Sequence, residues 1–285
     1  MGYGDDYAPM AAASILPESV ACVDPPGAPG VHRSGRGQTT VIYCPTVAGG
    51  KGVDVDGTML HTPLLMSRIL DHAASRHAGS TITGFDAALR PLSTRFDVIA
   101  GRSAATAHAL GALGVDDGDV VGVLSANRPE SVEALLAIPS MGAVALPLNF
   151  LQSRDHLVTA LQTYEVAVLM IDPALAAVAV DVVPAVPGLA HLVVMDSWAP
   201  EELDGLPVEV HPLESLLDGH ATTYPWPRLD ENTAAAIAYT SGTTRSARAV
   251  AFTHRSVWLH AMQMCTAESA ALSSADTVLT TIPIY

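Results

Sequence analysis

Basic residues are scarce in this chain, which has 14 lysines and arginines against 29 aspartates and glutamates and a formal net charge of −15. A protein that binds nucleic acid needs a basic surface to neutralise phosphates, and the sequence contains no basic stripe of that kind. The composition therefore argues against a nucleic-acid partner.

Cysteine is also rare, and its three occurrences, Cys22, Cys44 and Cys265, lie far apart in the sequence. This spacing matches neither a zinc motif nor the disulfide framework of a small secreted domain. We therefore expect the chain to reside in a reducing compartment, and we predict a cytoplasmic location.

Long uninterrupted apolar runs are absent from the sequence. The most apolar region, residues 166–195, contains Asp172, Asp181 and three prolines, whereas a membrane-spanning helix needs about 20 apolar residues with few charges. We therefore expect no transmembrane segment.

The chain changes character near Met59. Residues 1–58 are rich in glycine, alanine and proline and show no sustained period, which predicts a disordered leader. Two explanations stay open: a real flexible tail, or upstream sequence that precedes a natural start at Met59. Residues 59–285 form the second predicted region.

Strands and helices alternate in this second region. The spacing of apolar residues predicts a helix over residues 62–77, with Thr62 as its N-cap and Pro63 at its first position. Further helices are predicted at 95–113, 129–138 and 156–163, and valine-rich strands at 118–126, 142–149, 165–172 and 189–196. This alternation is typical of an α/β fold with a mainly parallel sheet and flanking helices.

The last third of the chain is less regular. Residues 197–230 are predicted to be loop-rich, strands are expected at 234–239 and 249–253, and a helix at 256–269 with Ser256 as its cap. The chain ends on an apolar run, residues 277–285, that we predict to be another strand. Because a buried strand at a chain end leaves backbone groups without partners, we expect a fold that is incomplete at its C-terminus.

The segment YTSGTTRSARAV, residues 239–250, joins two of these strands. Phosphate binding needs many short donors converging on one point, and small residues let the backbone approach an anion closely. Arg245 and Arg248 add positive charge. On composition alone an ordinary polar turn is the favoured explanation of the segment, because Ser, Thr and Gly dominate turns.

The flanks of this segment carry a resemblance. The run DENTAAAIAYTSGTT, followed by a spacer, an apolar strand and THRSV, closely resembles the AMP-forming acyl-CoA synthetases of the adenylate-forming ligase family. Upstream, GVDDGDVVGVLSANRPE and GAVALPLN are similar to that family's early region. WPRLDENTA (226–234) and residues 62–77 look most like the branch that activates fatty acids. The match runs from about Met59 to Tyr285 and implies the N-terminal part of the family's AMP-binding domain.

The resemblance implies a two-step reaction with the small-molecule substrates ATP, a fatty acid and coenzyme A, together with Mg²⁺. By position, the phosphate-loop residues are Thr240, Ser241, Gly242, Thr243 and Thr244. The resemblance also makes Thr244 a candidate for contact with ATP-bound magnesium.

The cationic end of the loop departs from the family pattern. Arg248 stands where the family has its loop lysine, and the family's two glycines and proline are replaced by Arg245, Ala249 and Ala247. The family's catalytic residues lie beyond the position of Tyr285, so we assign none here and expect the chain alone to be inactive. Alternative readings are a non-catalytic nucleotide- or acyl-binding remnant, an acyl-AMP ligase or an amino-acid adenylation domain.

Other polar residues receive structural interpretations. The eleven histidines are interpreted as scattered surface and capping residues, because pairs such as His72 and His77 lack the spacing of a helical metal site. Structural roles are expected for His254 and Arg255. Asn127 is expected to cap a helix.

Overall fold

The structure, a computed structural model, describes residues 62–85, 90–240, 248–282 and 284. All of them lie within one compact unit, residues 61–285. The predicted leader, residues 1–58, falls outside the described ranges and stays a prediction.

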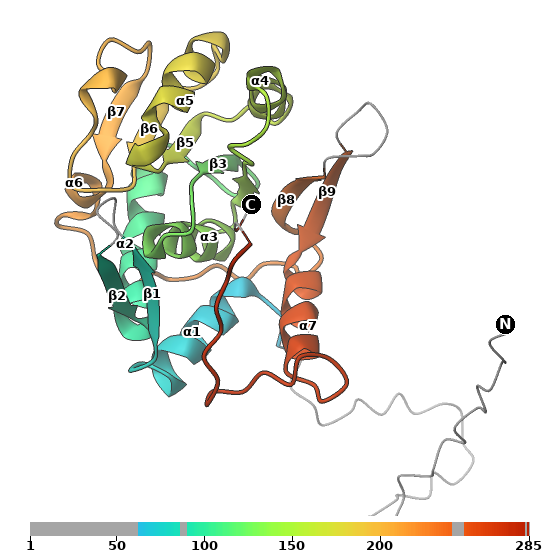
Figure 1. Ribbon diagram of the computed structural model, residues 1–285. Helices are drawn as coiled ribbons and strands as arrows, with labels where there is room; N and C mark the ends of the chain where they lie inside the picture. The colour runs from blue at the N-terminus through green and yellow to red at the C-terminus, as the bar shows by residue number, and fades with distance from the viewer. Residues whose placement is uncertain (1–61, 86–89, 241–247, 283, 285) are drawn as a thin grey trace, which may run out of the picture. The chain divides into compact units, whose positions relative to one another are not determined.

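Helices and strands alternate through most of the described chain (Figure 1). The helices are α1 Met66–Arg76, α2 Phe96–Ala112, α3 Pro129–Met141, α4 Arg154–Thr163, α5 Ala176–Val182, α6 Leu213–Leu217 and α7 His254–Met264. The strands are β1 Thr81–Phe85, β2 Pro91–Arg95, β3 Val120–Leu124, β4 Val144–Pro147, β5 Val168–Ile171, β6 His191–Val194, β7 Glu209–Pro212, β8 Ala234–Thr240 and β9 Arg248–Thr253. Short 3₁₀ helices lie at Pro173–Leu175, Val183–Ala185 and Glu201–Leu203.

The central feature is a seven-stranded sheet in the order β7-β6-β5-β3-β4-β8-β9 within the described ranges. Neighbouring strands are parallel from β7 to β8, and the last pair, β8 and β9, is antiparallel. This arrangement confirms the predicted α/β fold with a mainly parallel sheet. It also explains why the central strands are apolar throughout, since parallel strands are buried on both faces.

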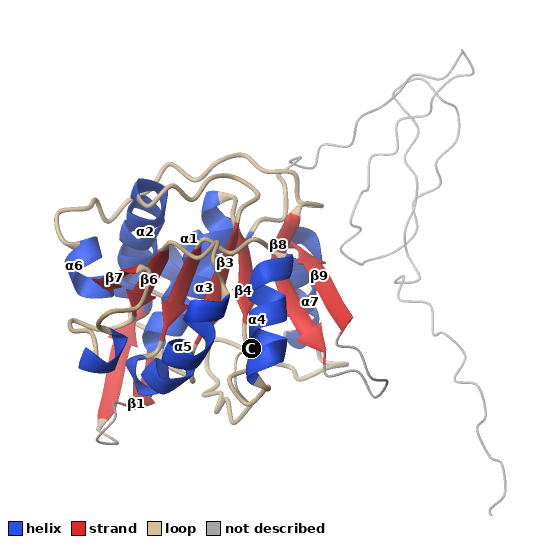
Figure 2. Ribbon diagram, turned by 90° about the horizontal axis from the view of Figure 1, so that it is seen from above, coloured by secondary structure: helices blue, strands red, loops and turns tan. Residues whose placement is uncertain are grey.

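Helices cover both faces of the sheet (Figure 2). On one face, α4 and α5 pack against Leu146, Leu169 and Leu192 in one hydrophobic core. On the other face, α2, α3 and α6 pack against Val121 and Met170 in a second core. No helix of the described chain is long and apolar enough to span a bilayer.

The first helix begins later than the sequence predicted. Residues 62–65 precede α1, which starts at Met66, so Thr62 and Pro63 are not its cap and first residue. The physical reason is tertiary: the backbone N–H of Leu64 donates to the Glu231 carboxylate at 2.7 Å. That distant hydrogen bond holds the chain in an extended approach to the helix.

Residues 197–230 are rich in loops, as predicted, although the short elements β7 and α6 lie within them. Another prediction needs correction. The strand predicted at the end of the chain is wrong, because residues 277–282 form no strand. Val278, Leu279 and Ile282 are exposed there, so this run does not extend the sheet.

Candidate functional site

In the sequence, the candidate phosphate loop lies between β8 and β9. These strands pair in antiparallel register along their length, and Thr240 at the end of β8 faces Arg248 at the start of β9. The pairing therefore holds Thr240 and Arg248, which flank segment 241–247 in the sequence, next to each other. Ser241, Gly242, Thr243 and Thr244 lie outside the described residues, so their predicted roles stay predictions.

Strand direction places the carboxyl end of β8 at a chemically favourable edge of the sheet. Because β8 runs parallel to β4, its carboxyl end lies on the same edge as those of β3, β4, β5 and β6. Ligands of open α/β sheets bind outside this edge. Polar residues follow the other strands there, namely Asn127 after β3, Asn149 after β4, Asp172 after β5 and Asp196 after β6.

Arg128 organises part of this edge. Its guanidinium lies 3.5 Å from Asp172, 3.3 Å from Asp196 and 3.2 Å from Glu130, and its Nη2 donates to the Met195 carbonyl at 3.2 Å. Burial alone would lower the pKa of Arg128, but the three carboxylates raise it above its ordinary value. Sequence patterns gave no signal for this role of Arg128, because Asp172, Met195 and Asp196 lie in other segments.

The base of the hairpin is fixed by a separate set of contacts. His254 is buried, and its Nδ1 accepts the Met66 N–H at 3.3 Å. Arg255 forms an ion pair with Glu231, which also accepts the Leu64 N–H. These bonds join the hairpin to the start of α1 and confirm the structural roles expected for His254 and Arg255.

The cap of α7 differs from the prediction. Its N-cap is Thr253, whose hydroxyl oxygen accepts the Ser256 N–H at 3.1 Å, so Ser256 lies inside the helix. The helix also ends at Met264, earlier than the predicted Ser269. The hydroxyl that accepts a free backbone N–H of the first turn of α7 thus belongs to Thr253, the last residue of β9.

Asn127 does not cap α3, contrary to the prediction, since the N-cap position is Arg128. Its side chain instead contacts the backbone near the end of the chain. The amide nitrogen donates to the Ile282 carbonyl at 3.0 Å, and the amide oxygen accepts the Ile284 N–H at 2.9 Å. Both groups of one side chain therefore anchor a segment 155 and 157 residues away.

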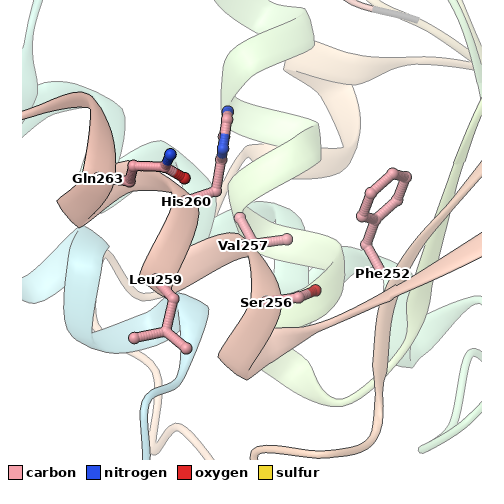
Figure 3. Close-up of a pocket in the computed structure, with 6 residues that line it drawn as sticks. All are labelled: Phe252, Ser256, Val257, Leu259, His260 and Gln263. Carbon is pink, nitrogen blue, oxygen red and sulfur yellow. The ribbon is translucent and has the colours of Figure 1, made fainter. Parts of the chain in front are cut away.

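An open hollow of about 460 Å³ lies beside the hairpin. Figure 3 shows Phe252 on β9 opposite a row of α7 side chains. The lining residues are Phe252, Ser256, Val257, Leu259, His260 and Gln263. Phe252 and Leu259 are exposed, so the hollow offers apolar surface between the end of β9 and α7.

The model of the AMP-binding enzyme family matches residues 93–285. The chain therefore belongs to this family of AMP-binding enzymes. The matched range includes the β8–β9 hairpin and the segment YTSGTT, which agrees with the resemblance found in the sequence.

Named relatives are CoA ligases. The chain is 28% identical over 230 residues to 3-methylmercaptopropionyl-CoA ligase of Ruegeria lacuscaerulensis, covering 80% of this chain and 42% of that protein. It is 25% identical over 232 residues to a medium-chain-fatty-acid–CoA ligase of Ectopseudomonas oleovorans, with the same coverage. The chain thus spans about two fifths of the length of these relatives.

Solved structures show the same fold. The anthranilate CoA ligase AuaEII, in complex with anthranoyl-AMP, has a TM-score of 0.60 at 21% identity, covering 69% of this chain and 36% of that one. An acyl-CoA synthetase of Brucella canis also has a TM-score of 0.60, at 18% identity, covering 73% and 36%. At these identities the similarity concerns the fold.

Proposed function

We propose that this chain carries the ATP-phosphate-binding loop of an AMP-forming acid–thiol ligase. The observation that supports this most strongly is the hairpin, which pairs Thr240 with Arg248 at the carboxyl edge of the parallel sheet. Membership of the AMP-binding enzyme family agrees with such a role.

The proposed reaction has two steps. A carboxylate oxygen attacks the α-phosphorus of ATP, the bond to the bridging oxygen breaks, and pyrophosphate leaves as acyl-AMP forms. The thiol sulfur of coenzyme A then attacks the acyl carbon, loses its proton and displaces AMP. Such chemistry depends mainly on positioning the reactants and on stabilising charge on phosphate oxygens.

The donors of the loop suit the terminal phosphates. In this proposal the hydroxyls of Thr240, Ser241, Thr243 and Thr244 and the backbone N–H groups around Gly242 bind the β- and γ-phosphates. Arg248 neutralises their charge, as a planar fork in place of the family's lysine. Thr244 also supplies a hydroxyl oxygen for the magnesium ion that accompanies ATP.

The acid is proposed to be a fatty acid. Medium-chain and long-chain fatty-acid ligases are among the relatives, the latter from Thermus thermophilus at 33% identity over 180 residues, covering 62% of this chain and 31% of that protein. The apolar hollow at Phe252 and Leu259, between the end of β9 and α7, offers a surface for such a substrate. A cytoplasmic location and the lack of a nucleic-acid partner stay predictions from composition.

The test is calorimetric titration of the 285-residue chain with ATP and Mg²⁺. We expect saturable binding, a loss of affinity of about tenfold or more in Arg248→Ala, and partial retention in Arg248→Lys, since a hydrogen bond to a charged group contributes about 1.5–3 kcal/mol. Arg154→Ala is the matched control, because Arg154 pairs with Asp155 and Asp181 on the surface.

A second assay, pyrophosphate release in the presence of ATP and a fatty acid, then distinguishes nucleotide binding alone from catalysis. ATP binding without turnover supports a nucleotide-binding role for this chain by itself. Turnover would mean that the chain holds a complete adenylating site. Absence of ATP binding, or equal affinity in Arg248→Ala and the unaltered chain, would refute the proposed loop.

A further inference from the structure

Three potential metal ligands meet on β6 and β7, far from the hairpin. His191 is the first residue of β6 and pairs in register with Glu209, the first residue of β7. His211 follows Glu209 by two positions, so the period of a strand places both on the same face. The topology thus joins residues that are 20 positions apart in the sequence.

Their ligand atoms are close to one another. Nδ1 of His191 lies 3.2 Å from Nε2 of His211, and one carboxylate oxygen of Glu209 lies 3.7 Å from each of these nitrogens. Two nitrogens bound to a tetrahedral Zn²⁺ at about 2.0–2.1 Å are about 3.3 Å apart. The three atoms therefore need to shift by only a few tenths of an ångström to share one ion.

We propose that His191, Glu209 and His211 form a binding site for a divalent transition-metal ion, with Zn²⁺ as the best match. Two imidazoles and one carboxylate favour zinc over magnesium or calcium, which prefer oxygen ligands alone. A hydrogen bond between the two rings would explain the 3.2 Å separation, but it does not explain why the carboxylate is equally close to both rings.

Exposure of the three side chains suits metal entry. The side chains of His191 and His211 are only 20% and 22% exposed, so most of each imidazole is packed against the protein. The side chain of Glu209 is 74% exposed, which leaves the site open to water. An ion bound here has three protein ligands and one side open to water, as in zinc sites with a free coordination position.

The position of the site separates it from the proposed ATP loop. Strands β5, β3 and β4 lie between β6 and β8 in the sheet, which amounts to about 19 Å at about 4.8 Å per strand. In addition, His191 begins its strand, whereas the loop follows the carboxyl end of β8. The metal would therefore link the edge strand β7 to β6 and would raise the stability of the folded chain, because it binds the native arrangement.

The experiment is titration of the metal-free chain with ZnCl₂, followed by thermal unfolding with and without zinc. Because histidines and cysteines elsewhere can bind zinc, the measured quantity is the difference from the unaltered chain. We expect His191→Ala and His211→Ala each to bind one zinc ion fewer per chain and to lose the zinc-dependent rise in Tm. His156→Ala, which removes an exposed histidine on α4, should keep both.

A milder variant keeps the test decisive if either alanine variant fails to fold. Glu209→Gln alters an exposed side chain and keeps its size, and it should weaken zinc binding by about tenfold or more. Equal stoichiometry and affinity in Glu209→Gln and in whichever histidine variant folds would overturn the proposal. Loss of the same ion in His156→Ala would also overturn it.

Discussion

The ionic cluster of Arg102, Glu133 and Glu214 allows a quantitative prediction. Nε of Arg102 lies 2.8 Å from both carboxylate oxygens of Glu133, and its two terminal nitrogens lie 2.9 and 2.7 Å from those of Glu214. Glu133 is 2% exposed, whereas Glu214 is 42% exposed. Arg102 therefore joins α2 to α3 through a buried carboxylate and to α6 through an exposed one.

Burial dominates the ionisation of Glu133. It raises the pKa of this carboxyl to about 7, although the charge and the hydrogen bonds of Arg102 act in the opposite direction. The folded state therefore binds the proton more tightly than the unfolded state does. The contribution to stability is complete below the ordinary pKa of 4.5 and is lost as the pH rises towards about 7.

Replacement Arg102→Met should enlarge this pH dependence. Without the guanidinium, the pKa of Glu133 rises further, and above it an unpaired charge is buried. We expect the free energy of unfolding to fall by about 3–5 kcal/mol near pH 8. Near pH 5 the carboxyl is protonated in the folded variant, so the loss should be about 1–2 kcal/mol, from hydrogen bonds and packing.

Urea denaturation followed by circular dichroism at both pH values measures these losses. The double variant Arg102→Met/Glu133→Gln should lose most of the difference between the two pH values, because no buried carboxyl is left at this cluster to ionise. Arg154→Met, at an exposed ion pair, should cost less than about 1 kcal/mol at either pH. An equal loss at both pH values in Arg102→Met would refute the reasoning.

Two further predictions concern the hairpin base and the end of the described chain. Burial lowers the pKa of His254, against the opposing charge of Asp117, and its Nε2 has no hydrogen-bond partner among the described residues. Stability linked to His254 should therefore be present above about pH 6.5 and lost as the pH falls through the lowered pKa. His254→Gln should remove this part of the acid dependence in urea denaturation, and an unchanged dependence would contradict it. Asn127→Ala should raise hydrogen exchange at Ile284, whose N–H the Asn127 side chain accepts, while the urea midpoint stays nearly unchanged. Unaltered exchange there would show that this side chain does not anchor the segment.

Prediction from sequence worked best where the signal was local. The central strands and α2, α3 and α4 were found because apolar spacing and turn residues mark such elements over a short stretch. It was weakest at chain segments whose partners are distant. The start of α1 was placed too early because Glu231 and His254 hold residues 64–66, and the last apolar run was taken for a strand although it lies exposed.

Of the two candidate sites, the one marked by a local sequence pattern was recognised and the one formed by separate strands was not. The segment YTSGTT and the strands on either side of it could be recognised in the sequence, and the pairing of Thr240 with Arg248 follows from the hairpin they form. The cluster of His191, Glu209 and His211 was not recognised. Alternation in Glu209-Val210-His211 was the available signal, since residues two apart on a strand share a face.

The sequence by itself therefore determined the alternation of strands and helices, the acidic character of the chain and the position of the hydroxyl loop, because these depend on neighbouring residues. The tertiary structure decided which distant side chains meet. Arg102 and Glu214 are 112 residues apart, and His191 joins His211 because β6 and β7 are neighbours in the sheet. Strand order follows from how all the elements pack together, so no short stretch of sequence specifies it.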